Sequence, residues 1–166
     1  MRVFVAGASG AIGTRLVPQL VERGHKVVGT TRSEEKARRV IEAGAEPVVL
    51  DVLDQGAVGE AVAAARPDAI VHEATALSGV GDYRNLDHTF ALTNRLRTAG
   101  TDALLAGAQG AGVDRFVAQS FTSWPYARVG GPIKTEEDPL DSNPPATTRE
   151  TLAAIKHLER AKGWSR

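Results

Sequence analysis

The sequence has no cysteine, no net charge and no long hydrophobic run, and each of these absences excludes a class of protein. Without cysteine there is no disulfide, no thiol nucleophile and no cysteine-ligated metal. Twenty Lys and Arg residues balance twenty Asp and Glu residues, so the chain lacks the charge that favours nucleic acid or an anionic membrane as a partner. No apolar run approaches the ~20 residues of a membrane span, and the apolar stretch at the N-terminus is too short for a signal peptide. We therefore expect a cytoplasmic protein with neither a nucleic-acid nor a membrane partner.

Metal-ligand spacing is also missing. The four histidines are scattered along the chain, at positions 25, 72, 88 and 157, and we expect no metal site. A length of 166 residues with 42% hydrophobic content is enough for one domain with a buried core.

What the chain does have is a regular alternation of short β-branched runs and alanine-rich or leucine-rich helical segments. The runs predict strands at 2–6, 26–30, 46–50, 68–73 and 115–120, and the helical segments lie near 11–23, 33–43, 55–65, 86–111 and 147–162. Strands separated by helices pair in parallel, so the sequence predicts an α/β fold, a doubly wound parallel sheet (Rossmann fold) of about five strands with helices on both faces. Glycines in "ERGH", "EAGAEP" and "AGVDR" stand where left-handed helix ends are expected, and residues 121–145, rich in proline, predict a long loop.

The stretch "GASGAIG" at residues 7–13 joins the first predicted strand to the first predicted helix. Glycines here let backbone N–H groups and the helix N-terminus approach a diphosphate closely, with Gly7 permitting the turn, Gly10 the close approach and Gly13 the packing of helix on strand. The spacing is G-x-x-G-x-x-G rather than the standard G-x-G-x-x-G, and glycines also serve ordinary turns. Because strand, turn and helix occur in the right order, we predict dinucleotide binding. The predicted contacts are Gly7, Ser9, Gly10, Ala11, Ile12 and Gly13.

The end of the second predicted strand bears on the choice of dinucleotide. A carboxylate that would hold the ribose of NAD is missing there, and Arg32 is present. Its guanidinium can pair with a 2′-phosphate, which favours NADP over the alternative, NAD. In the other interpretation, Arg32 is a solvated residue before a helix capped by Ser33, and Glu34 or Glu35 reaches the ribose.

Four stretches in order carry a resemblance to a known family: "GASGAIG", "LDVLD" at 50–54, "IVHEAT" at 70–75 and "AGAQGAGVDRFVAQSF" at 106–121. Together they resemble the extended short-chain dehydrogenase/reductases of the NAD-dependent epimerase/dehydratase type, over essentially the whole chain. The resemblance implies that Asp51 and Val52 lie against the adenine, that Glu73, Ala74 and Thr75 line the middle of the cofactor, and that Asn94 sits on a long helix behind the site. Two structural alternatives remain: Asp51 caps the next helix, and Asn94 bends its helix through a buried hydrogen bond.

The usual catalytic pair of that family is absent. Its members use a tyrosine with a lysine four residues later, but the residues four beyond Tyr83 and Tyr126 are Asp87 and Gly130. When residues 151–159 are laid on the corresponding helix of the family, Thr147 and Thr151 take the two places, and a threonine hydroxyl is too weak an acid to replace a phenol.

Substitutes for the pair lie after the fifth predicted strand. Ser120, Thr122 and Ser123 stand where the family supplies a hydroxyl to the substrate, and Tyr126 is a candidate proton donor whose pKa Arg128 or Lys134 would lower. We name Ser120, Thr122 and Tyr126 as candidate catalytic residues, while the alternative for Tyr126 is that it only packs. Trp124 either covers the nicotinamide or closes the loop.

His72 and Glu73 are neighbours on a strand and point to opposite faces, so we do not expect them to act as an acid/base pair. We expect His72 to be a half-buried histidine with satisfied hydrogen bonds.

The chain stops where family members continue into a substrate-binding lobe, so residues 1–166 are predicted to be a dinucleotide-binding Rossmann domain without that lobe. The uncovered fifth strand predicts either a fragment or a covering partner such as a second copy of the chain. Three functions fit the sequence: an NADP-using oxidoreductase or epimerase/dehydratase-like enzyme acting on a small carbonyl or hydroxyl substrate, a non-catalytic NADP sensor, and a bare scaffold.

Overall fold

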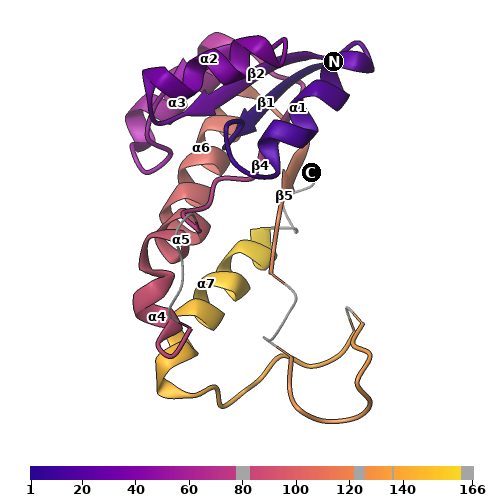
Figure 1. Cartoon of the computed structure of the whole chain (residues 1–166), viewed down its shortest axis with the longest axis vertical. Helices are drawn as coiled ribbons and strands as arrows, with labels where there is room; N and C mark the ends of the chain where they lie inside the picture. The colour runs from indigo at the N-terminus through magenta and orange to yellow at the C-terminus, as the bar shows by residue number, and fades with distance from the viewer. Residues whose placement is uncertain (78–82, 122–125, 136, 162–166) are drawn as a thin grey trace.

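The sheet has five parallel strands in the order β3-β2-β1-β4-β5 (Figure 1). The computed structural model describes residues 1–77, 83–121, 126–135 and 137–161. The strands are β1 (Arg2–Ala6), β2 (Lys26–Thr31), β3 (Glu46–Val49), β4 (Ala69–His72) and β5 (Phe116–Ala118). The chain runs outward from β1 to β3, then returns to the other side of β1 with β4, so the strand order reverses between β1 and β4. The predicted doubly wound fold is confirmed, and its ligand crevice is expected at this reversal.

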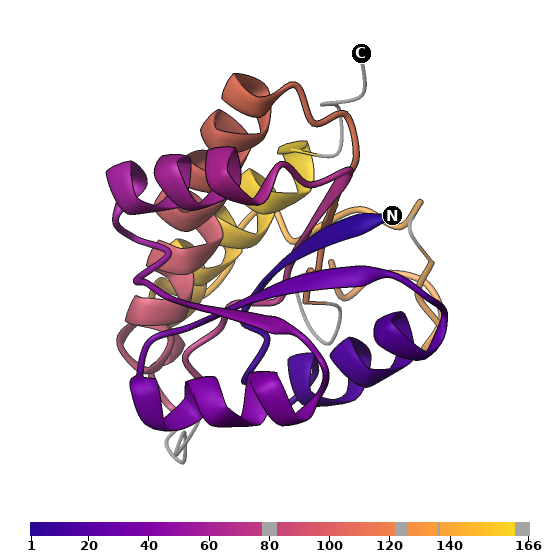
Figure 2. The same ribbon diagram turned by 90° about the horizontal axis from the view of Figure 1, so that it is seen from above.

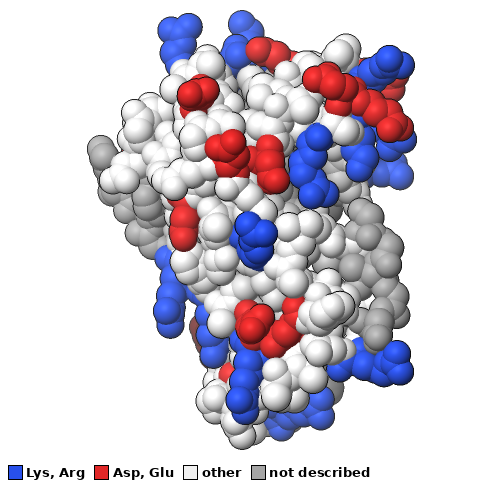
Figure 3. Space-filling view, turned by 90° about the vertical axis from the view of Figure 1, so that its left-hand side faces the viewer, with Lys and Arg blue, Asp and Glu red and all other residues white. Residues whose placement is uncertain are grey.

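Helices cover both faces of the sheet. On one face lie α1 (Gly13–Glu22) and α2 (Glu34–Glu42), and on the other lie α3 (Gln55–Ala65) and α6 (Thr101–Ala111), as Figure 2 shows. Lys and Arg side chains are interspersed with Asp and Glu over the face drawn in Figure 3, in keeping with the zero net charge. Within the described residues, no helix is long and apolar enough to cross a membrane.

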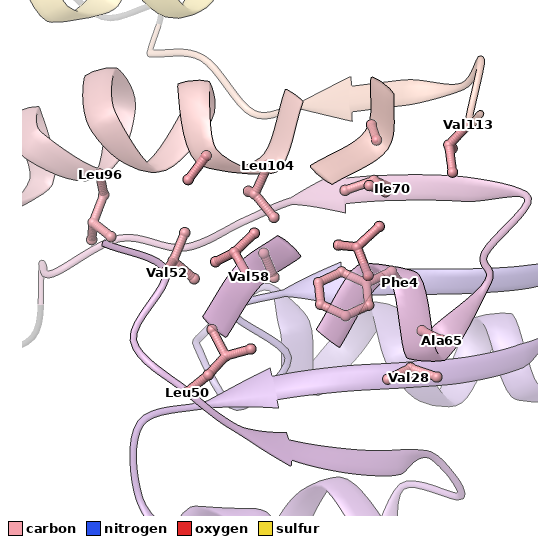
Figure 4. Packing of buried hydrophobic residues seen from close by; sticks show 14 residues of the cluster. Phe4, Val28, Leu50, Val52, Val58, Ala65, Ile70, Leu96, Leu104 and Val113 are labelled. Carbon is pink, nitrogen blue, oxygen red and sulfur yellow. The ribbon is translucent and has the colours of Figure 1, made fainter. Parts of the chain in front are cut away.

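Two hydrophobic clusters hold the layers together, one on each face of the sheet. Alternate residues of β1 serve the two clusters, because successive side chains of a strand point to opposite faces. Phe4 packs with Ile70 and with Val58 of α3 and Leu104 of α6 (Figure 4). Val3 and Val5 join a second cluster with Val17 of α1 and Val40 of α2. Burial on both faces explains why the strand reads as the continuous apolar run "VFVA".

The expected helix ends are present. Gly24, Gly44 and Gly112 follow α1, α2 and α6 with φ of 80°, 84° and 70°, which confirms the predicted left-handed ends.

The single helix expected over 86–111 is interrupted, which corrects the prediction. The segment consists of α4 (Leu86–Thr89), α5 (Ala91–Arg95), a π-helical turn η1 (Leu96–Gly100) and α6. Carbonyl groups around the wide turn find other donors: Thr98 Oγ1 donates to Asn94 O at 3.0 Å and Thr101 Oγ1 donates to Arg97 O at 2.9 Å. Periodicity indicated a continuous helix because these threonines look like ordinary helix residues until their hydroxyl partners are known.

The C-terminal helix is positioned by a distant carboxylate. A 3₁₀ turn η2 (Ala146–Thr148) leads into α7 (Arg149–Arg160), and Thr148 makes no side-chain capping bond. Asp87 of α4 instead accepts the N–H groups of Thr151 at 2.8 Å and Glu150 at 3.1 Å. In the described part of 121–145 the regular structure is limited to one isolated bridge between Tyr126 and Leu140, as expected for a loop.

Candidate cofactor-binding site

A pocket of about 560 Å³ opens at the carboxyl ends of β1, β2 and β4, where the strand order reverses. Backbone and side chains of the β1–α1 loop, the end of β2 with α2, the β3–α3 loop and the end of β4 form its wall. The lining residues are Gly7, Ser9, Gly10, Ala11, Thr30, Thr31, Arg32, Ser33, Lys36, Arg39, Leu50, Asp51, Val52, Glu73, Ala74, Thr75 and Leu96. The site therefore brings together most of the residues predicted to hold a dinucleotide.

The β1–α1 loop packs so closely against neighbouring backbone at Gly7 and Gly13 that neither position has room for a side chain. Gly7 has φ of +91°, and a Cβ there would stand 2.8 Å from the backbone of Ala74. A Cβ on Gly13 would stand 2.4 Å from Gly7 O and 2.5 Å from Ala8 O. The close contact of Gly13 is therefore with the backbone directly after β1 rather than with the strand itself.

Two threonines of β2 hold the β1–α1 loop in place through hydrogen bonds. Thr30 O accepts the N–H of Ala8 at 3.0 Å, Thr30 Oγ1 accepts that of Gly7 at 3.1 Å, and Ser9 Oγ lies 2.9 Å from Thr31 Oγ1. Both threonines are buried. Sequence reasoning missed this role, since threonine is common in strands whether or not its hydroxyl is used.

The N-terminus of α1 is left open for a ligand. Its N-cap, Ile12, makes no side-chain capping bond. Among the described residues no acceptor is found for the N–H groups of Ala11, Ile12 and Gly13. Unsatisfied N–H groups and the positive end of the helix dipole together favour an anion such as a diphosphate.

The other end of the pocket carries three cations. Arg32 lies there as predicted, together with Lys36 and Arg39 of α2. Lys36 and Arg39 are three residues apart and so lie on one side of their helix, which is the sequence signal that would have found them. Ser33 caps α2 by accepting the N–H of Lys36 at 3.3 Å. Glu34 and Glu35, the alternative ribose ligands, do not line the pocket.

Asp51 and Val52 both border the pocket, on the loop between β3 and α3. Asp51 Oδ1 accepts the N–H of Leu53 at 3.0 Å, whereas α3 is capped by Asp54, which accepts the N–H of Ala57 at 3.0 Å. The alternative that Asp51 caps this helix is therefore wrong. Val52 is 4% exposed and also belongs to the hydrophobic core.

Glu73, Ala74 and Thr75 line the pocket beyond β4. Glu73 continues the sheet by donating its N–H to Ala6 O at 2.8 Å. Its side-chain atom Oε2 is buried and has no hydrogen-bond partner among the described residues, and burial raises the pKa of the carboxyl.

His72 lies on the opposite side of β4, in the core. Its Nδ1 accepts the N–H of Ala74 at 3.3 Å, which leaves Nε2 to donate to Leu96 O at 3.2 Å, so the ring is neutral. Burial is the main cause that lowers its pKa. The prediction of satisfied hydrogen bonds is confirmed, but the side chain is buried at 4% exposure rather than half-buried, because η1 covers it.

Asn94 lies outside the pocket lining, in a buried polar network. Its Nδ2 donates to Thr151 Oγ1 at 3.0 Å, and Arg97 donates to its Oδ1 at 3.5 Å. The Arg97 guanidinium stands 5.6 Å above the ring of Phe121, and burial lowers its pKa. Arg97 is 5% exposed and was not singled out in the sequence, where it looks like an ordinary helix surface residue.

Of the candidate catalytic residues, Ser120 and Tyr126 do not line the pocket. Ser120 Oγ donates to Glu159 Oε1 of α7 at 2.7 Å, beside a separate cavity of about 30 Å³. Tyr126 is half-buried and its backbone bridges to Leu140. Lys134 Nζ donates to Val129 O and lies 3.9 Å from Asp138 Oδ1, so these contacts of Lys134 are with residues of its own loop. Thr122, like Ser123 and Trp124, lies outside the described residues.

Residues 3–158 match the model of the NAD-dependent epimerase/dehydratase family. The chain belongs to this family. The family resemblance carried by the four sequence stretches is thereby confirmed.

Several epimerase/dehydratase family relatives are reductases by name. The chain is 43% identical over 162 residues to a 3-diazoavenalumate denitrifying reductase of a Streptomyces species, covering 96% of this chain and 51% of that protein. It is 35% identical over 160 residues to a 4-hydroxy-2-methyl-3-oxo-4-farnesyl-3,4-dihydroquinoline-1-oxide ketoreductase of Stigmatella aurantiaca, covering 95% of this chain and 45% of that protein. The chain thus spans about half the length of the curated relatives it matches.

Solved structures agree on the fold. The UDP-glucose 4-epimerase of Thermus thermophilus in complex with NAD superposes with a TM-score of 0.75 at 24% identity, covering 98% of this chain and 50% of that one. A UDP-glucose 4-epimerase of Stenotrophomonas maltophila with bound NAD gives a TM-score of 0.74 at 22% identity, covering 98% and 48%.

Proposed function

We propose that this chain is the cofactor-binding part of an NADP-dependent oxidoreductase that acts on a small carbonyl or hydroxyl substrate. The observation that carries the proposal is the open N-terminus of α1 above a pocket whose loop has no room for side chains at Gly7 and Gly13. In this assignment the N–H groups of residues 11–13 bind the diphosphate and Asp51 and Val52 border the adenine. The bound nicotinamide would supply hydride transfer. The two reductases and the NAD-bound epimerases among the relatives support this chemistry.

The preference for NADP rests on the three cations at the adenine end of the pocket. Arg32, Lys36 and Arg39 all line it, and a guanidinium can bind a phosphate through two parallel hydrogen bonds. Among the described residues the ion pairs found involve none of these three side chains. Their charges are therefore available to a 2′-phosphate.

Calorimetric titration of the 166-residue chain with NADPH and NADH tests the proposal. We expect tighter binding of NADPH, and we expect Arg32→Ala to reduce that preference by about tenfold or more, as for a lost charge-assisted hydrogen bond of ~1.5–3 kcal/mol. Arg38→Ala is the matched control, because Arg38 lies on the adjoining helix α2, is exposed and does not line the pocket. An unchanged ratio of the two affinities in Arg32→Ala would remove Arg32 from the account.

A non-catalytic NADP sensor is the second candidate, favoured by the absence of the tyrosine–lysine pair and by the fact that neither Ser120 nor Tyr126 lines the pocket. Turnover of a panel of carbonyl compounds with NADPH, compared between wild type and Tyr126→Phe, separates the two. Loss of rate in the variant with unchanged NADPH affinity supports Tyr126 as proton donor. Equal rates exclude Tyr126, and binding without turnover by the wild type supports the sensor.

A further inference from the structure

Glu73 is an acidic residue in the wall of the proposed dinucleotide pocket, and a dinucleotide is itself a polyanion. Glu73 follows β4 directly and shares the pocket wall with the glycine-rich loop. The backbones of the two segments are in close contact, since a Cβ added at Gly7 would stand 2.8 Å from the backbone carbon C of Glu73. A carboxylate here would meet the negative charge that the free N–H groups of α1 are arranged to attract.

The structure gives the ionised carboxylate of Glu73 little support. Oε2 is buried, and none of the described residues donates a hydrogen bond to it. Among the described residues no cation forms an ion pair with Glu73. Burial without a counter-charge disfavours the ionised form, in agreement with the direction in which the pKa moves.

The charged groups around Glu73 lie at other parts of the pocket or on the other face of the sheet. The β1–α1 loop contributes no titratable side chain between residues 7 and 13. The neighbouring elements contribute Arg32 at the end of β2, Lys36 and Arg39 of α2, Asp51 after β3, His72 on the opposite face of β4, and Arg97 of η1 on the side of His72. Burial is the cause found for the raised pKa of Glu73, with no contribution from these charges.

We propose that Glu73 binds the dinucleotide in its protonated form, as a hydrogen-bond donor to an oxygen of the diphosphate or of the adjoining ribose. This inference rests on the proposed function. A carboxylic acid has one O–H to donate, whereas a carboxylate can only accept. The nearby phosphate charges favour the neutral form of Glu73 further, so cofactor binding takes up a proton.

The sign of the pH dependence follows from this linkage. The cofactor complex holds the Glu73 proton more tightly than the free protein, so the dissociation constant increases with pH between the two pKa values. The increase approaches about tenfold per pH unit in that window, and it is complete above the pKa of the complex. Glu73→Gln carries a permanent N–H donor of the same shape, so its affinity should not follow this titration.

The experiment measures the dissociation constant of NADH between about pH 5 and 8.5 for wild type, Glu73→Gln and Glu60→Gln, whose glutamate is exposed on α3 and does not line the pocket. NADH is the probe because it lacks the 2′-phosphate, which itself titrates near neutral pH. We expect wild type to bind NADH more weakly as the pH rises and Glu60→Gln to keep the wild-type slope. We expect Glu73→Gln to show a flat profile and to bind more tightly than wild type at the alkaline end. Calorimetry in two buffers of different ionisation enthalpy should show proton uptake for wild type and none for Glu73→Gln.

The outcomes separate this inference from the proposed function. If Glu73→Gln keeps the wild-type slope, or binds more weakly than wild type at every pH while its thermal unfolding is unchanged, Glu73 acts as a carboxylate acceptor or not at all and the inference is overturned. If neither NADH nor NADPH binds any of the three proteins, the proposed function falls and takes the inference with it.

Discussion

At the residue scale, the lack of a Cβ at Gly7 allows the β1–α1 loop to pass close to the backbone that follows β4. The φ of +91° at Gly7 and the 2.8 Å approach to the backbone of Ala74 leave no space for a side chain. We expect Gly7→Ala to lose dinucleotide binding and about 1–3 kcal/mol of unfolding free energy, because both the left-handed backbone and the contact with Ala74 are violated. Urea unfolding and a titration with NADPH measure the two effects.

Gly59→Ala is the control for that substitution. Gly59 lies inside α3, and nothing stands within 4 Å of the position of an added Cβ. Alanine is the better helix former by roughly 0.5–1 kcal/mol, so this variant should be more stable and bind as wild type does. Equal behaviour of the two variants would contradict the role given to Gly7.

The buried ring of His72 predicts a second residue-scale effect, on stability against pH. Because burial lowers its pKa in the folded chain, the unfolded chain binds the proton more readily. The contribution of His72 is then complete above the unfolded pKa of about 6.5 and is lost as the pH falls from there toward the folded pKa. Urea unfolding at several pH values should show this decline in wild type, and a smaller decline in His72→Gln, whose amide does not titrate. A decline of equal slope in both proteins would assign the acid sensitivity to other groups.

At the scale of elements, α7 depends on α4 for its N-terminal cap. Asp87 accepts two N–H groups of the first turn, a function that a residue of α7 itself usually serves. We expect Asp87→Ala to cost about 1–2 kcal/mol of unfolding free energy, because those N–H groups lose their acceptor. Chemical denaturation measures this loss.

Asp102→Ala provides the comparison for the helix cap. Asp102 of α6 also contacts α7, through His157 Nε2 at 2.7 Å, but both side chains are substantially exposed. Exposed ion pairs contribute about 0–1 kcal/mol, so this variant should lose less than Asp87→Ala. The reverse order would mean that α7 is held by the His157 contact rather than by its cap.

At the scale of the whole molecule, binding of the cofactor should increase the stability of the folded chain. A ligand that binds only the folded chain adds about 2.7 kcal/mol to its stability at a concentration of one hundred times the dissociation constant. We expect NADPH to raise the thermal midpoint of the chain more than NADH does, and we expect Arg32→Ala to remove most of the difference. A thermal shift assay over a concentration series gives both values. A midpoint that neither dinucleotide moves would contradict binding.

The sequence by itself determined the succession of strands and helices along the chain, the position of the glycine-rich turn and the position of Arg32 at the end of the second strand. These features are local: apolar period, glycine position and chain order are written in neighbouring residues, and a parallel sheet follows from their alternation. The pocket residues Lys36 and Arg39 were within reach of the same reasoning, through their spacing on α2.

Only the tertiary structure decided which side chains satisfy one another across the chain. His72 Nε2 donates to Leu96 O of the π-helical turn, 24 residues further along the chain, and the cap of α7 depends on Asp87, which lies 63 and 64 residues before the N–H groups it accepts. Hydrogen bonds between distant residues leave no periodic trace in a sequence, because either partner alone is an ordinary polar residue. The unpartnered Oε2 of Glu73 belongs to the same class, since a group without a partner can be recognised only after every neighbour has been placed.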